Sequence, residues 1–195
     1  MDHQAAKRFI LAELHAGLPS MRTYHCFEHT LDVTAAVLRI AQNEGITGED
    51  VALLETAALF HDAGYMVQPQ HHEQGSCMLA LEHLPRFGYG PSHVERITGM
   101  IMGTMVPQRA NDPLSEILCD ADLDYLGRDD FFIIGDRLFQ ELRAEGRLHT
   151  RREWNVLQHT FLGGHTYFTA TSRALRETAK QAHMAEVRQW LNEHP

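Results

Sequence analysis

The sequence predicts a mostly or entirely α-helical protein. Apolar residues recur at intervals of three and four along almost the whole chain, which is the periodicity of helices with one buried face. No stretch alternates apolar and polar residues with the enrichment in Val, Ile and Thr that is typical of a strand. The chain has 195 residues, so we expect it to fold as one domain.

Glycine and proline divide the first half of the chain into five expected helices. Gly45 follows the second helix, Gly64 ends the third, and Pro85 breaks the fourth. Ser92, with Glu95 three residues later, predicts a capping box at the start of the fifth. The expected ranges are about 2–15, 25–43, 47–64, 72–84 and 92–102.

The second half of the chain carries four more helix starts. Asp112 followed by Pro113 predicts the first of them, because Asp is a good N-cap and Pro suits the first helical position. Another helix follows Asp129, and Thr150 opens the next with a capping box. The last helix covers about 172–192 and is mostly polar.

Composition excludes several classes of protein. Lys and Arg number 17 against 26 Asp and Glu, a formal net charge of −9, which argues against a nucleic-acid-binding surface. The sequence has no run of about 18 apolar residues that could form a membrane span, and its N-terminus lacks the pattern of a secretion signal. We therefore expect a cytoplasmic protein. The 14 histidines, with no C-x-x-C pair, favour a metal site built from imidazole and carboxylate.

Histidines lie on the apolar faces of two expected helices, where an unpaired polar group is costly. His29 is in line with Val33 and Val37 at steps of four. His61 ends the apolar stripe of the third helix, and Asp62 follows it directly. These positions predict that all three polar side chains point inward.

The sixth helix carries three acids close together. Its apolar stripe runs through Leu114 and Leu118 to Asp122, which we therefore expect to point inward. Helical phase places Asp120 and Asp124 on the opposite face, and we expect both to be solvated.

A single metal ion bound by all of these polar side chains would explain why they point inward. The expected ligands are His29, His61, Asp62 and Asp122, since two neutral imidazoles and two carboxylates neutralise a divalent ion. Mn, Fe, Zn, Ni and Mg all remain open as its identity. The alternative is that each histidine is hydrogen-bonded separately in the core.

The ordered set of these residues resembles the HD-domain superfamily of metal-dependent phosphohydrolases. Its signature is a histidine, a later His-Asp pair and a final aspartate on successive helices. The matching stretches are Tyr24–His29, Leu59–Tyr65, His71–Ser76 and Asp120–Gly127. The resemblance implies an α-helical bundle with its core over about 20–127 and additional C-terminal helices over about 128–195, in one domain over residues 1–195. It also implies that the four residues named above are the metal ligands.

Two further histidines acquire roles through this resemblance. Tyr24-His25 followed by His29 looks like the opening motif of the cyclic-nucleotide phosphodiesterase branch, in which the first histidine is the general acid. His25 is thus a catalytic candidate, although Cys26 departs from the Asn usual in that motif. His72 matches a position that supplies a second-metal ligand in several branches, and a substrate contact or a surface location is the alternative.

We expect one firmly held metal ion, with a second weak or absent. The fifth helix reads Ile101-Met102-Gly103-Thr104, where members with several metals usually have another histidine. The glutamate that nucleotidase members place soon after His-Asp is also missing, because Ala63-Gly64-Tyr65 follows, and this argues against a nucleotidase.

The function expected from the resemblance is hydrolysis of a phosphate mono- or diester by metal-activated water. Asp62 would orient or deprotonate that water, and His25 would protonate the leaving oxygen. The expected partner is a small phosphorylated substrate of nucleotide-like character, with no nucleic acid and no membrane, and a homo-oligomer is left open.

Three alternatives stay open. An oxygenase with a di-iron site can be built on the same scaffold, and a catalytically silent ligand-binding module needs only a degraded site. His25-Cys26-Phe27-Glu28-His29 is also a literal H-x-x-E-H zinc-peptidase motif. Against the peptidase, Glu28 is in line with Asp32 on a face that we expect to be solvated, and His61, Asp62 and inward Asp122 would be left unexplained.

Overall fold

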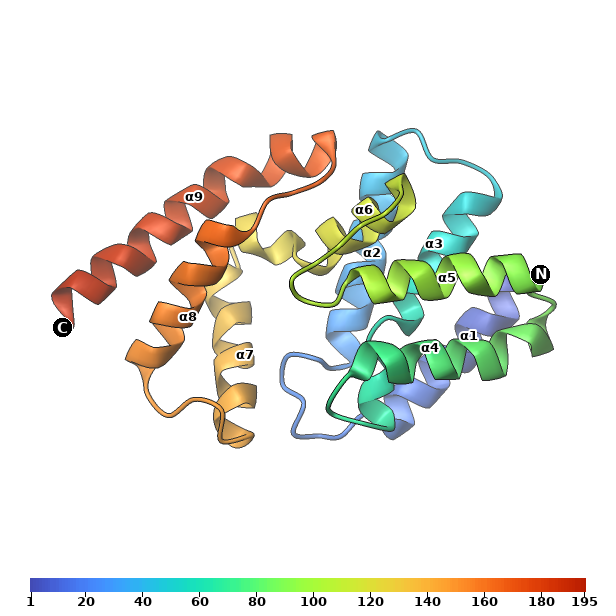
Figure 1. Cartoon of the computed structure of the whole chain (residues 1–195), viewed down its shortest axis with the longest axis horizontal. Helices are drawn as coiled ribbons and strands as arrows, with labels where there is room; N and C mark the ends of the chain where they lie inside the picture. The colour runs from blue at the N-terminus through green and yellow to red at the C-terminus, as the bar shows by residue number, and fades with distance from the viewer.

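The computed structural model of the chain describes residues 1–195 and is all-α, as predicted (Figure 1). The α-helices are α1 (His3–Gly17), α2 (Phe27–Asn43), α3 (Glu49–Phe60), α4 (His72–His83), α5 (Pro91–Gly103), α6 (Pro113–Asp122), α7 (Phe131–Ala144), α8 (Arg151–Gly164) and α9 (Ala170–Glu193). Three short 3₁₀ helices lie between them: η1 (Ala63–Met66), η2 (Leu84–Phe87) and η3 (Asp124–Gly127).

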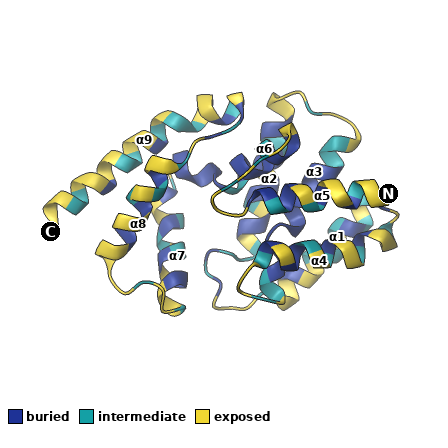
Figure 2. Cartoon of the chain, viewed as in Figure 1, coloured by how far each residue is buried: buried dark blue, intermediate teal, exposed yellow.

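Helices α1 to α6 form a bundle around α3, which packs against α1, α2, α5 and α6. All residues of α3 from Leu53 to Phe60 are buried, because neighbouring helices cover it on every side. The buried faces of the bundle turn toward one another (Figure 2). This packing holds the C-terminal end of α3, where His61 and Asp62 follow, deep inside the molecule.

Helices α7, α8 and α9 form a separate layer beside the bundle (Figure 1). Their own apolar cluster is anchored on Phe131, Leu162 and Tyr167, and η3 joins it to the bundle. The long helix α9 packs against α8 and η3. The C-terminal helices are thus attached to the bundle next to the last turn of α6, and α7 also contacts the segment before α2 through Glu141.

The expectation that Asp120 and Asp124 are solvated is wrong. Asp120 is fully buried and accepts hydrogen bonds from the backbone of Phe168 (2.8 Å) and from the backbone and hydroxyl of Thr169 (2.8 and 2.7 Å). Asp124 is also buried and accepts from Arg176. The face of α6 that helical phase assigns to solvent is covered by the C-terminal layer, and paired donors offset the cost of burying the two carboxylates.

Most helix ends follow the sequence signals, with exceptions at α3 and α5. The sequence predicts that the third helix ends at Gly64, but α3 ends at Phe60 and Gly64 lies in η1. The side chains of Asp112 and Thr150 cap α6 and α8 as predicted. At α5 the N-cap is Gly90, not Ser92, and the backbone N–H of Gly90 donates to Nδ1 of His93. No helix combines the length and the apolar character needed to cross a membrane.

Candidate metal centre

The structure brings together all four residues that the sequence predicts to be ligands. His29 comes from α2, His61 and Asp62 from the end of α3, and Asp122 from the last residue of α6. The distances from Nε2 of His29 are 3.4 Å to Asp62 Oδ2 and 3.3 Å to Asp122 Oδ1. Those from Nε2 of His61 are 3.3 Å to Asp62 Oδ2 and 3.5 Å to Asp122 Oδ1.

The free ring nitrogens in this cluster are oriented by their surroundings. Nδ1 of His61 lies 2.7 Å from the carbonyl oxygen of Ala58, which can only accept, so Nδ1 donates and Nε2 faces the carboxylates. Nε2 of His29, Nε2 of His61 and Oδ2 of Asp62 are buried without a hydrogen-bond partner. Orphaned buried polar atoms are rare, and here they face one another. A cation placed among them would satisfy all of them, so the donor set fits a divalent metal ion.

The electrostatics of the cluster also demand positive charge. Burial alone would raise the pKa of Asp62, but the charge and hydrogen bond of His61 hold it well below the usual range. Burial likewise opposes a charged His61, yet Asp62 and Asp122 raise its pKa well above the usual value. Without a cation, an imidazole must supply the charge that balances the buried carboxylate of Asp62 and the partly buried carboxylate of Asp122. A divalent ion would do so while leaving both histidines neutral.

A tight turn after Asp62 places His72 next to it. A β-carbon on Gly64 would lie 1.8 Å from the carbonyl oxygen of His72, so only glycine allows this approach of η1 to α4. Ser76 of α4 donates to the carbonyl of His61 (2.6 Å) and accepts from the N–H of Gly64 (2.8 Å). Nε2 of His72 thereby lies 3.2 Å from Oδ1 of Asp62, the oxygen that does not face the four-residue cluster.

His25, the candidate general acid, lies just before α2 and outside the cluster of ligands. Its Nδ1 is 2.6 Å from Oε1 of Glu141, a residue of α7. Tyr65 packs against its ring, with centroids 4.5 Å apart. Burial would raise the pKa of Glu141, but the hydrogen bond and charge of His25 and the neighbouring donors lower it to about 2. The carboxylate beside His25 is therefore ionised.

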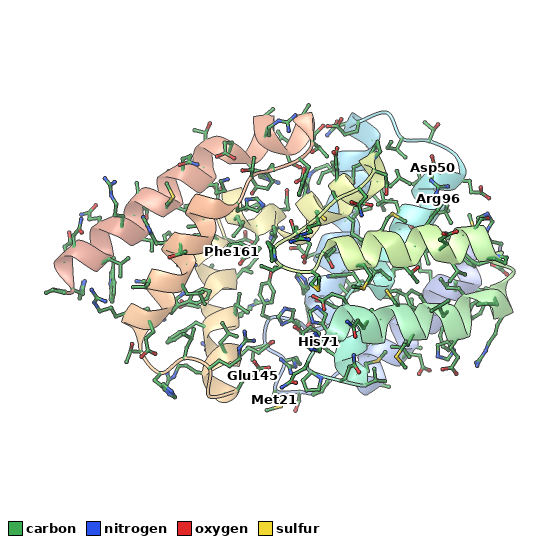
Figure 3. All side chains as sticks on the ribbon, in the orientation of Figure 1. Met21, Asp50, His71, Arg96, Glu145 and Phe161 are labelled. Atoms are coloured by element: carbon green, nitrogen blue, oxygen red, sulfur yellow. The ribbon has the colours of Figure 1, made fainter.

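A cavity of about 270 Å³ connects the candidate centre with the C-terminal layer. One end is lined by His25, Asp62, His72 and Asp122. The opposite wall, from α7 and α8, is mostly apolar and comprises Leu138, Leu142, Trp154, Leu157, Gln158 and Phe161. Figure 3 labels Phe161 on α8 and His71 at the start of α4, which lie on the two sides of this region. The arrangement can hold a molecule with a polar end at the metal ligands and an apolar end against α8.

Sequence reasoning missed two acids at this site. Glu73, which is buried, follows His72 and also lines the cavity, with Oε1 3.5 Å from Nε2 of His72. Glu141 is in line with Ile134 and Leu138 at steps of four and three, which is the same signal that identified Asp122. The candidate glutamate of the peptidase motif, Glu28, is exposed, and His25 is turned toward Glu141.

The family model for the HD domain matches residues 26–124. The chain therefore belongs to the HD-domain family, a family of metal-dependent phosphohydrolases. HD domains bind divalent metals, which agrees with the cluster of His29, His61 and Asp122.

Solved structures share the fold over almost the whole chain, including the C-terminal layer. Bacillus subtilis YpgQ has 21% identity and a TM-score of 0.70, covering 100% of this chain and 98% of its own. YpgQ in complex with ADP has 17% identity and a TM-score of 0.67, covering 99% and 98%. A predicted HD superfamily hydrolase from an uncultured Thermotogales bacterium has 21% identity and a TM-score of 0.63, covering 96% and 92%. No curated protein sequence matches the chain.

Proposed function

We propose that this protein hydrolyses phosphate esters of a small, nucleotide-like substrate with a divalent ion held by His29, His61, Asp62 and Asp122. The observation that carries the proposal is the group of three buried, unpartnered polar atoms that face one another at the ends of α2 and α3. An ion bound there would supply an activated water and offset charge on the phosphoryl oxygens. Family membership supports the same chemistry.

The chain's own residues would divide the remaining work. Asp62 borders both the cluster and the cavity, so its carboxylate is placed to orient the attacking water or to accept its proton. His25 lines the same cavity and would donate a proton to the leaving oxygen as the P–O bond breaks. His72 would hold Asp62 in place through the 3.2 Å contact at Oδ1.

The shape and lining of the cavity support a nucleotide-like substrate. The phosphate would lie at the end with His25 and His72, and Arg147 adds a cation to the lining. The apolar wall of α7 and α8 suits a planar, weakly polar group such as a nucleobase. One structural neighbour, YpgQ, has been solved in complex with ADP.

The test is a screen of phosphate esters, including nucleoside mono-, di- and triphosphates and nitrophenyl phosphates, with and without added divalent metal. We expect metal-dependent release of phosphate or alcohol that a chelator abolishes. Asp62→Ala should lose this activity, whereas Glu28→Ala should keep it. Binding of ADP without any turnover would favour a silent ligand-binding module, and metal-dependent oxygen consumption would favour the oxygenase.

A further inference from the structure

Glu141 makes an unusually complete set of contacts with the segment that carries His25. Oε1 accepts from Nδ1 of His25 (2.6 Å) and from Nη1 of Arg22 (2.9 Å). Oε2 accepts from the backbone N–H groups of Tyr24 (2.9 Å) and His25 (3.1 Å). The side chain is 2% exposed, and it belongs to α7, outside the residues that match the HD family model.

These contacts determine which nitrogen of His25 is engaged by Glu141. A carboxylate can only accept, so Nδ1 carries the proton in this pair and Nε2 is the nitrogen free to exchange a proton. Tyr65 packs against the face of the ring and Tyr24 meets it edge to face at 4.7 Å, so rotation of the ring is restricted. His25 itself lines the cavity together with Asp62 and Asp122.

We propose that Glu141 is the positioning residue for His25: it fixes the Nδ1–H form of the ring and aims Nε2 into the cavity, where Nε2 exchanges the proton. The inference rests on the proposed phosphohydrolase function. In the step concerned, the proton leaves Nε2 for the leaving oxygen, which keeps the electron pair of the breaking P–O bond. Nε2 is left with a lone pair and takes up a proton again from solvent. The Nδ1–H group keeps its proton throughout and remains hydrogen-bonded to Glu141.

Glu145 provides a matched control one helical turn beyond Glu141, at the C-terminal cap of α7. It pairs with Arg22, as Glu141 does, but makes no contact with His25. Replacing Glu145 therefore disturbs the same arginine and the same helix without touching the imidazole. A purely structural role of Glu141 predicts similar effects of both substitutions, whereas a positioning role predicts an effect of Glu141→Gln alone.

The kinetic test compares esters with different leaving groups. With an alkyl phosphate ester, Glu141→Gln should lower kcat roughly 10- to 100-fold at nearly unchanged KM, as for loss of other partners that orient a functional side chain. With a nitrophenyl ester the loss should be much smaller, because nitrophenolate leaves without a proton. In a His25→Ala background, Glu141→Gln should add almost no further loss on the alkyl ester. Glu145→Gln should match the wild type throughout.

Equal losses on both esters, or a full additional loss in the His25→Ala background, would overturn the positioning role while leaving the hydrolase proposal standing. A second readout does not need activity. In ¹⁵N-histidine-labelled, zinc-loaded protein, the His25 signals, assigned by their absence in His25→Ala, should show a protonated Nδ1 in the wild type and Glu145→Gln. Glu141→Gln should lose that pattern. An unchanged pattern in Glu141→Gln contradicts the inference even if no phosphate ester is hydrolysed.

Discussion

Oδ1 of Asp62 lies 3.2 Å from Nε2 of His72, while Oδ2 of the same carboxylate faces the imidazoles of His29 and His61. One aspartate therefore has one oxygen in the candidate metal centre and one oxygen outside it. The histidine of α5, His93, contacts Glu49 and Gly90 instead, so we propose that His72 holds Asp62 in orientation.

His72→Ala should leave the metal content of the protein unchanged and lower turnover roughly 10- to 100-fold, the usual cost of removing a partner of a metal ligand. Elemental analysis and steady-state kinetics on the same preparation measure both. A wild-type content near two ions per chain that falls to one in His72→Ala would show instead that His72 binds a second ion.

Gly64→Ala should destabilise the protein by at least about 2 kcal/mol, because the new β-carbon would meet the backbone of His72 at 1.8 Å and of Ser76 at 2.7 Å. The control is Gly99→Ala, at an exposed helical position with nothing within 4 Å, which should raise stability by up to about 1 kcal/mol. Urea denaturation measures both. Equal stabilities of the two variants would show that η1 and α4 are further apart than the structure has them.

Asp120→Asn should lower stability by about 1 to 3 kcal/mol without loss of metal, because an amide would direct a donor at N–H groups that need an acceptor. Asp129→Asn, on an exposed residue, is the matched control and should change stability by less than about 0.5 kcal/mol. Loss of metal in Asp120→Asn would show that this carboxylate belongs to the metal centre and not to the contact with the segment that precedes α9.

Glu141 should make stability depend on pH in the acid range. Its pKa is about 2 in the folded protein against 4.5 for an unperturbed glutamate, so the unfolded chain binds more protons between these values. The stabilisation is therefore fully present above about pH 5 and is lost as the pH falls toward 2, by an amount on the order of 1 to 3 kcal/mol. The free energy of unfolding of the chelator-treated protein, measured by denaturation at several pH values in this range, should depend less steeply on pH in Glu141→Gln than in the wild type. The same pH dependence in both proteins would contradict the buried ion pair of Glu141 with Arg22 and His25.

Much of the fold and of the candidate site could be predicted because local patterns encode them. Apolar stripes oriented His29 and Asp122 correctly, and Asp112 and Thr150 marked real helix starts. Asp120 was misplaced because helical phase shows which way a side chain points, not whether a second layer covers that face. The pairing of Glu141 with His25 could not be predicted because the two residues are 116 positions apart and meet only when α7 docks beside the bundle.

The most direct test of the account is the metal content of Asp122→Ala beside that of Glu28→Ala, measured by elemental analysis of the purified proteins. The structure predicts close to one divalent ion per chain in the wild type and in Glu28→Ala, because Glu28 is exposed and outside the cluster. It predicts almost no bound metal in Asp122→Ala, because removal of the carboxylate leaves the ion under-coordinated. Metal retained in Asp122→Ala and lost in Glu28→Ala would contradict the assignment of this centre.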